Sequence, residues 1–149
     1  MTQKGPAFRK PSALERILNR AFGALVGLGL GLRHNYLLQT RGRKTGRVYS
    51  TPVNVLKLEG RRFLVAPRGR TDWVRNAEAA GEVTLKRGRS RLRLRIRSVP
   101  AAEKREILSA YLGRFRRTVQ RYFPAPAGSR PEAFAELVDR YPVFELLPR

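Results

Sequence analysis

The segment from residue 91 to 99 constrains the fold more than any other part of the chain, because two kinds of side chain alternate along it. Leu92, Leu94 and Ile96 are separated by arginines at positions 91, 93, 95 and 97. Successive side chains of a strand point to opposite faces, so the segment is predicted to be a β-strand with one buried face. The arginine face is interpreted as the solvent side of a sheet, with a phosphate-contacting face as the alternative.

Short strands separated by glycine and proline turns are predicted along most of the remaining chain. They are expected at residues 36–40, 48–58, 62–66, 83–86 and 141–147, with a hairpin turn at 87–89. Pro52 places the middle of the second strand at a sheet edge or a bulge. Helices are expected at 72–80, capped by Thr71 and Asp72 and closed by Gly81, at 101–122, and from 131 to 138. This pattern predicts an α+β fold whose sheet forms a closed or half-closed barrel.

The chain is predicted to form one domain, because no repeat or internal linker divides it. Residues 1–34 are expected to hold a basic tail and an apolar or amphipathic helix, and residues 35–149 the barrel. The apolar run from Ala21 to Leu32 is shorter than the roughly 20 residues of a membrane-spanning helix. It is interpreted as packing on the domain's own core, with a membrane-interface helix as the alternative. No signal peptide is recognisable, so a cytoplasmic location is expected, with a peripheral position at the inner face of the plasma membrane as a further option.

The amino-acid composition argues against several kinds of active site. The chain has no cysteine and one histidine, His34, which argues against a disulfide framework, a thiol nucleophile, a zinc–thiolate site and a serine–histidine triad. With 32 basic and 11 acidic residues, the net charge is +21. Such a chain is expected to bind anions, which leaves nucleic acid, an anionic membrane surface and a polyanionic small molecule as partner classes.

Two segments are candidates for binding an anion. The first is the turn from Gly42 to Arg47, where three cationic side chains lie between glycines that let backbone N–H groups converge. A solvated basic hairpin is the alternative. The second runs from Ala66 through Arg68 into the helix that carries Trp73 and Asn76. These two residues lie one helical turn apart, which suits contact with a planar ring, whereas a buried core tryptophan is the alternative.

Taken together, these segments resemble the deazaflavin-dependent nitroreductase family, whose members use the reduced deazaflavin coenzyme F420. The resemblance rests on the run Leu37-Leu38-Gln39-Thr40-Arg41-Gly42-Arg43-Lys44-Thr45-Gly46-Arg47, on Pro52 in the next strand, and on the Trp73-x-x-Asn76 helix. It extends over residues 35–99 and the C-terminal Tyr141-Pro142-Val143-Phe144. It implies a split β-barrel of the FMN-binding, pyridoxamine-phosphate-oxidase-like type with flanking helices.

The resemblance also implies a cofactor and an activity. F420 would bind through its phosphate and oligoglutamate tail to Arg43, Lys44 and Arg47, with Thr45 and Gly46 completing the loop. Its ring would be lined by Pro52, Ala66, Arg68, Trp73 and Asn76. The implied reaction is hydride transfer from the reduced cofactor to a quinone-like or nitro-aromatic acceptor.

On the acceptor side, Tyr49, Asn54 and Tyr111 are the residues expected to make contact. Asn54 stands where the best-known branch of the family has an aromatic residue. The stretch from Tyr122 to Arg130, which is tyrosine-rich in some members, is basic and broken by prolines here. The acceptor pocket is therefore expected to differ from theirs.

Other functions fit parts of the sequence. A basic nucleic-acid-binding protein would explain the charge, but the basic residues are spread over nearly every element and no recognised motif is present, so no specific nucleic acid is expected. An FMN-binding barrel explains less of the loop's charge, because FMN has a phosphate and no oligoglutamate tail. A cofactor carrier without turnover is the third alternative, and the oligomeric state is left open.

Overall fold

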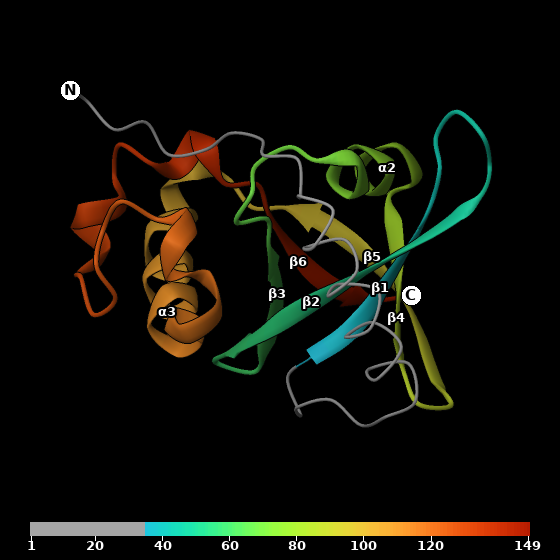
Figure 1. Ribbon diagram of the computed structural model, residues 1–149, viewed down its shortest axis with the longest axis horizontal. Coiled ribbons are helices and arrows are strands. Elements are labelled where there is room, and N and C mark those ends of the chain that lie inside the picture. Colours follow the sequence, from blue (N-terminus) through green and yellow to red (C-terminus); the bar gives the residue numbers. More distant parts are fainter. Residues whose placement is uncertain (1–34) are drawn as a thin grey trace.

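The computed structural model describes residues 35–149, and the tail, the helix and His34 discussed above lie outside this range. Six antiparallel strands close into a barrel in the order β1-β2-β3-β6-β5-β4 (Figure 1). The strands are β1 (Asn35–Arg41), β2 (Val48–Leu58), β3 (Arg61–Val65), β4 (Glu82–Arg87), β5 (Ser90–Ser98) and β6 (Val143–Pro148). The expected barrel is confirmed, and each expected strand is present with ends that shift by one or two residues at most.

The long strand β2 pairs with a different neighbour along each half. Residues 48–54 pair with β1, and residues 55–58 pair with β3. Pro52 lies opposite Leu37 in the first half, where no described strand pairs with the other edge of β2. A proline has no N–H to donate, so it is tolerated at a position that is paired on one side only. The expected edge position of Pro52 is confirmed.

The barrel interior forms one hydrophobic core. Buried side chains of all six strands and the segment after β3 fill it: Leu38, Val55, Leu64, Ala66, Val83, Leu85, Leu94, Phe144 and Leu146. Helix α2 (Asp72–Ala80) packs Val74 and Ala77 against the same core, and it ends at Gly81, whose φ of 74° is the left-handed conformation expected of a closing glycine. Thr71 precedes α2, but its buried hydroxyl finds no partner among the described residues. The expected side-chain cap by Thr71 is therefore wrong.

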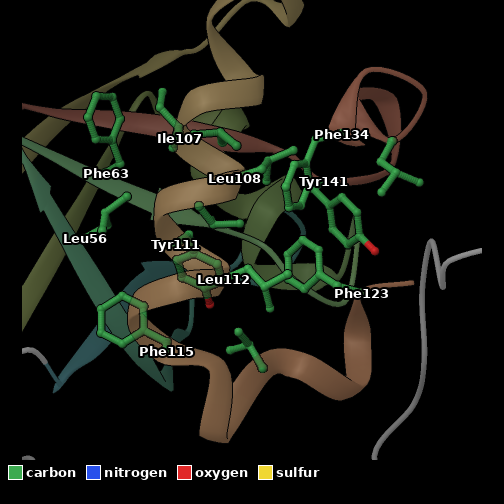
Figure 2. Packing of buried hydrophobic residues seen from close by; sticks show 14 of the residues in the cluster. Leu56, Phe63, Ile107, Leu108, Tyr111, Leu112, Phe115, Phe123, Phe134 and Tyr141 are labelled. Atoms are coloured by element: carbon green, nitrogen blue, oxygen red, sulfur yellow. The ribbon is translucent and has the colours of Figure 1, made fainter. Parts of the chain in front are cut away.

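Helix α3 (Ala101–Val119) forms a second core on the outside of the barrel. Its buried residues share one cluster with the outward side chains of Leu56 and Phe63 on β2 and β3. Figure 2 shows Ile107 on the side of Leu56 and Phe63, and Leu108 and Leu112 on the side of Phe134 and Phe123. The backbone departs from helical angles at Phe115, and the helix ends at Val119 before a short 3-10 turn, η1 (Gln120–Tyr122). No helix within residues 35–149 is long and apolar enough to cross a membrane.

The segment from 131 to 140 is not the expected α-helix. It forms two 3-10 turns, η2 (Pro131–Phe134) and η3 (Val138–Arg140). Phe134 and Leu137 are buried in the core beside α3. Residues three apart lie on one side of a 3-10 turn as well as of an α-helix, so the apolar spacing did not separate the two.

The alternation along β5 is confirmed at its centre and fails at its start. Leu94 is buried in the barrel and Ile96 is partly buried against the same core. Leu92 is 42% exposed, because it lies close to the β4–β5 hairpin turn, where core side chains no longer cover it. The expectation that Leu92 is buried is therefore wrong.

An ion-pair cluster connects three strands on the outer surface. Glu145 of β6 is 8% exposed and accepts hydrogen bonds from Arg61 of β3 and Arg97 of β5. Glu103 at the start of α3 lies 3.6 Å from Arg61 and 3.2 Å from Arg97. The hydrogen bonds from Arg61, followed by those from Arg97, lower the pKa of Glu145 to about 2 against the opposing effect of burial. The cluster holds β6 between β3 and β5 and joins α3 to them.

Candidate functional site

The loop from Gly42 to Arg47 joins β1 and β2 and has a closed backbone shape. The Gly42 N–H donates to the Arg47 carbonyl at 2.6 Å, and the Gly46 N–H donates to the Gly42 carbonyl at 2.9 Å. Gly46 has a φ of 76°, a conformation that favours glycine. Arg41 adds a bond from outside the loop, because its Nη1 donates to the Gly46 carbonyl at 2.8 Å. The loop is therefore a formed structure before any ligand binds.

Gly42 is required by a close approach inside the loop. A Cβ at this position would lie 2.7 Å from Cε2 of Tyr49 and 2.8 Å from Oγ1 of Thr45. The Thr45 hydroxyl accepts from the Arg47 N–H at 3.2 Å and shares a 3.3 Å hydrogen bond with the Tyr49 hydroxyl. Tyr49 thus packs on the loop, although it was expected on the acceptor side. Its ring is 46% exposed.

Asn76 connects the loop to α2, 33 residues along the chain. Its Oδ1 accepts from the backbone N–H of Arg43 at 3.1 Å and from Arg43 Nη1 at 2.7 Å. Arg43 Nη2 also lies 3.6 Å from Oδ1 of Asp72 at the start of the helix. Asn76 itself is only 3% exposed. The structure thus brings together two predicted site residues, but it turns the Arg43 guanidinium toward the helix.

Arg43, Lys44 and Arg47 are all exposed residues, and they differ in that the Arg43 guanidinium donates a hydrogen bond to Asn76. Sequence reasoning grouped these three cations as equivalent. In the structure Arg43 holds the loop against α2, while Lys44 and Arg47 face solvent. Sequence reasoning also missed Arg41 as a residue of the site. The only signal was its position next to Gly42, and nothing in the pattern showed that its side chain would reach Gly46.

Trp73 is neither the buried core tryptophan nor the freely exposed ring contact that the sequence left as alternatives. Its side chain is half-buried against the barrel core, and its ring meets that of Phe144 edge-on with centroids 6.0 Å apart. Ala66 is buried in the same core, and its N–H donates to the Pro142 carbonyl at 2.9 Å. Arg68 is half-buried in the turn that leads from β3 to α2. The indole is therefore neither fully buried in the core nor fully exposed.

Of the three residues expected on the acceptor side, Asn54 and Tyr111 lie together, whereas Tyr49 lies apart from them. Tyr49 and Asn54 are five residues apart on β2, which corresponds to about 17 Å along a strand and to opposite faces. Asn54 lies on the outer face near α3, where it accepts a hydrogen bond from Asn35 and donates to Thr118 at 3.4 Å. Tyr111 is buried beneath it on α3. Burial raises the pKa of Tyr111, and a hydrogen bond with Asn54 opposes that rise.

Comparison with known families shows to which class of protein the chain belongs. The sequence model of a family described as F420H(2)-dependent quinone reductase matches residues 14–123. The chain belongs to this family. Members are F420-dependent reductases, so the protein is an enzyme of that class. A search of curated protein sequences finds no match.

Solved structures similar to this F420-dependent reductase show the same fold. An F420-H2 dependent reductase, FDR-A, superposes with a TM-score of 0.51 at 18% identity over 76% of this chain and 94% of its own. An FAD-binding protein from Mesorhizobium loti gives 0.52 at 14% identity, with 95% and 92% covered. A protein described as a candidate pyridoxamine 5'-phosphate oxidase from Listeria innocua gives 0.51 at 8% identity, with 85% and 90% covered. The fold is a split β-barrel of the flavin-binding type.

The loop of this F420-dependent reductase has the chemistry that the cofactor demands. A phosphate is bound by cationic side chains that are free to approach it. Lys44 and Arg47 are exposed cations on a closed loop, and Gly42 leaves no room for a side chain inside it. The residues present therefore fit an anionic cofactor.

Proposed function

We propose that this protein transfers a hydride from reduced F420 to a quinone-like or nitro-aromatic acceptor. The observation that carries the proposal is the loop from Gly42 to Arg47, which is closed by its own backbone bonds and fixed to α2 through Asn76. A loop that is already formed loses little conformational freedom when a ligand binds, so more of its interaction energy appears as affinity. When bound, reduced F420 supplies the hydride for an acceptor that also takes up a proton.

We assign the cofactor phosphate to the side chains of Lys44 and Arg47, and we retain Thr45 and Gly46 as the loop residues that the resemblance implies. Arg43 is assigned to the positioning of the loop, because its guanidinium bonds Asn76. For the ring we retain the residues that the resemblance implies: Pro52, Ala66, Arg68, Trp73 and Asn76. The indole of Trp73, half-buried and next to the loop's contact on α2, supports this placement.

On the acceptor side we propose that Asn54 makes the direct contact and that Tyr111 acts through it. Pro52 and Asn54 are two residues apart on β2 and face the same side, so a ring over Pro52 has Asn54 as its neighbour. Asn35, Thr118 and Tyr111 surround Asn54 and hold its amide in place. Tyr49 is proposed to contact the acceptor only at the loop end of the strand.

We further propose that the enzyme works in the cytoplasm at the inner face of the plasma membrane, where quinones are dissolved. The net charge of +21 supports attraction to anionic lipid. Co-sedimentation with vesicles containing anionic lipid, but not with neutral vesicles, is the expected result. Equal recovery of the protein in both supernatants at low salt would contradict a membrane role.

The cofactor assignment is tested by titration of the purified protein with F420, followed through the fluorescence of Trp73, the single tryptophan. FMN serves as the comparison ligand. Quenching by F420 at micromolar concentration, followed by oxidation of the reduced cofactor when menadione is added, is the expected result. Quenching without oxidation would identify a carrier, and stronger quenching by FMN would favour an FMN protein.

Variants locate the phosphate site. Replacing both Lys44 and Arg47 by alanine is expected to weaken F420 binding by about 2 kcal/mol, the loss of two partly solvated charge-assisted contacts. Lys57→Ala is the matched control, because Lys57 is an exposed lysine on the far half of β2. Unchanged affinity in the double variant would remove the loop from the site.

A further inference from the structure

The second half of helix α3 and the segment after it carry positive charge without a balancing acid. Residues 107–131 contain five arginines, at positions 114, 116, 117, 121 and 130, and no aspartate or glutamate. The two acidic residues of α3, Glu103 and Glu106, both stand in its first two turns, where Lys104 and Arg105 balance them. The surplus positive charge of the helix is therefore concentrated toward its C-terminal end.

Three of these arginines, Arg114, Arg116 and Arg117, form what we call the α3 arginine surface. All three are exposed, whereas Phe115 between them is buried in the core. Within residues 35–149 no carboxylate forms an ion pair with any of the three. The arginines around Glu145, by contrast, are held by carboxylates. The guanidinium groups of the α3 arginine surface are therefore available to an external anion.

The α3 arginine surface borders the residues that we assign to the acceptor side. Thr118, which follows Arg117 directly, is exposed, and its Oγ1 accepts a hydrogen bond from Asn54 Nδ2 at 3.4 Å. Tyr111, which we propose to act through Asn54, is buried on the same helix. Figure 1 shows α3 on the left of the barrel, away from α2, to which the cofactor loop is fixed. An anionic surface that binds these arginines therefore lies close to the acceptor side of the enzyme.

We propose that the α3 arginine surface binds the phosphate groups of anionic membrane lipids and so turns the acceptor side of the enzyme toward the bilayer. This inference rests on the proposed function and deepens it, because the net charge supports a membrane role without saying which surface meets the lipid. A guanidinium binds phosphate oxygens through several N–H groups, and each basic side chain at an anionic membrane strengthens binding about fivefold. A quinone dissolved in the bilayer then reaches Asn54 without passing through bulk water.

Co-sedimentation of the full-length protein with vesicles tests which arginines meet the lipid. Vesicles of phosphatidylglycerol mixed with phosphatidylcholine are compared at low salt with vesicles of phosphatidylcholine alone, and duplex DNA serves as a second polyanion. The test variant carries Arg114→Gln, Arg116→Gln and Arg117→Gln. The matched control removes the same charge from exposed arginines on α2, in the β4–β5 turn and in the first half of α3: Arg75→Gln, Arg89→Gln and Arg105→Gln. Thermal unfolding verifies that both variants are folded.

A fluorescent label reports how the protein is oriented on the vesicle. The chain has no cysteine, so Gly113→Cys carries a single thiol-reactive, polarity-sensitive dye next to Arg114. Gly113 is exposed, and a Cβ there meets no atom of the described residues within 4 Å. Ala79→Cys, at an exposed position of α2, is the matched control. On anionic vesicles the emission of the dye at position 113 is expected to shift to the blue, and that of the dye at position 79 to stay unchanged.

The test variant is expected to bind anionic vesicles about a hundredfold more weakly than wild type, three steps of about fivefold, and the control variant to bind like wild type. Equal losses in both variants, equal shifts of both dyes, or tighter binding of the α3 arginine surface to DNA than to vesicles would overturn the inference. Failure of wild type to bind anionic vesicles would overturn it together with the membrane role, whereas F420 binding, measured separately, would leave the hydride transfer standing. Failure of wild type to bind F420 would overturn the proposed function and, with it, the orientation of an acceptor side.

Discussion

Removing the Asn76 amide tests how the cationic loop is held. In Asn76→Ala the Arg43 backbone N–H loses a 3.1 Å bond and the Arg43 guanidinium loses a 2.7 Å bond. A neutral hydrogen bond contributes about 1 kcal/mol and one to a charged group about 1.5–3 kcal/mol. The Arg43 side chain is 27% exposed and keeps Asp72 nearby, so water and that carboxylate replace part of the loss. We expect the free energy of unfolding to fall by about 1–2 kcal/mol.

Urea unfolding measures that difference, and amide hydrogen exchange of residues 42–47 shows where it arises. The loop amides are expected to exchange faster in Asn76→Ala, and F420 affinity to fall as the loop becomes mobile. Asn76→Asp is the informative control: its carboxylate accepts the same two bonds and should keep the loop ordered, yet its negative charge should still weaken the binding of an anion. Unchanged loop exchange and unchanged stability in the alanine variant would refute the clamp.

Three further substitutions test other parts of the molecule. Glu145→Gln should lower the free energy of unfolding by about 1–2 kcal/mol at neutral pH, because two partly exposed arginines lower the folded-state pKa of Glu145 from the ordinary 4.5 to about 2. Urea unfolding should show this loss at every pH above 4.5, and the loss should vanish as the pH falls to about 2. A loss that does not depend on pH would contradict the reasoning. Gly42→Ala should displace Tyr49 and weaken F420 binding at least fivefold with little change in melting temperature, as calorimetry can measure. Tyr141→Phe removes a buried 2.5 Å bond to the Tyr122 carbonyl and should cost about 1–2 kcal/mol by thermal unfolding, with no effect on F420 affinity.

The strands and α2 were predictable because their signals are local. The boundaries of β2 match expectation because a glycine turn stands at each end, and α2 stops at Gly81 because glycine alone adopts its left-handed angles without strain. Barrel closure followed from the number and alternation of the strands. The pairing of β6 with both β3 and β5 could not be read locally, because it depends on contacts such as that between Arg61 and Glu145, 84 residues apart.

The errors in prediction arise where a local pattern has more than one structural solution. Phe134 and Leu137 have a spacing that suits an α-helix, but 3-10 turns place residues three apart on one side as well, and here they bury both side chains. Leu92 belongs to the apolar side of the alternation, but it lies close to the hairpin turn, where core side chains no longer cover it. In each case the apolar positions were identified correctly. The sequence did not show how much neighbouring structure is available to cover them.

The candidate site shows a different limit. The sequence showed where positive charge is concentrated, but it could not show which charges are available to a ligand. Arg43 is directed inward because Asn76, on a helix placed by the barrel core, offers it an acceptor. Arg61 and Arg97 are engaged with Glu145, and Arg70 with Glu78. A net charge of +21 therefore overstates the number of cations that are available to an anion. If the charge served nucleic acid in general, affinity for DNA would fall evenly as surface arginines were removed one at a time. A built site predicts instead that the exposed cations of the loop dominate the binding of F420, and that DNA binding stays weak and strongly salt-dependent.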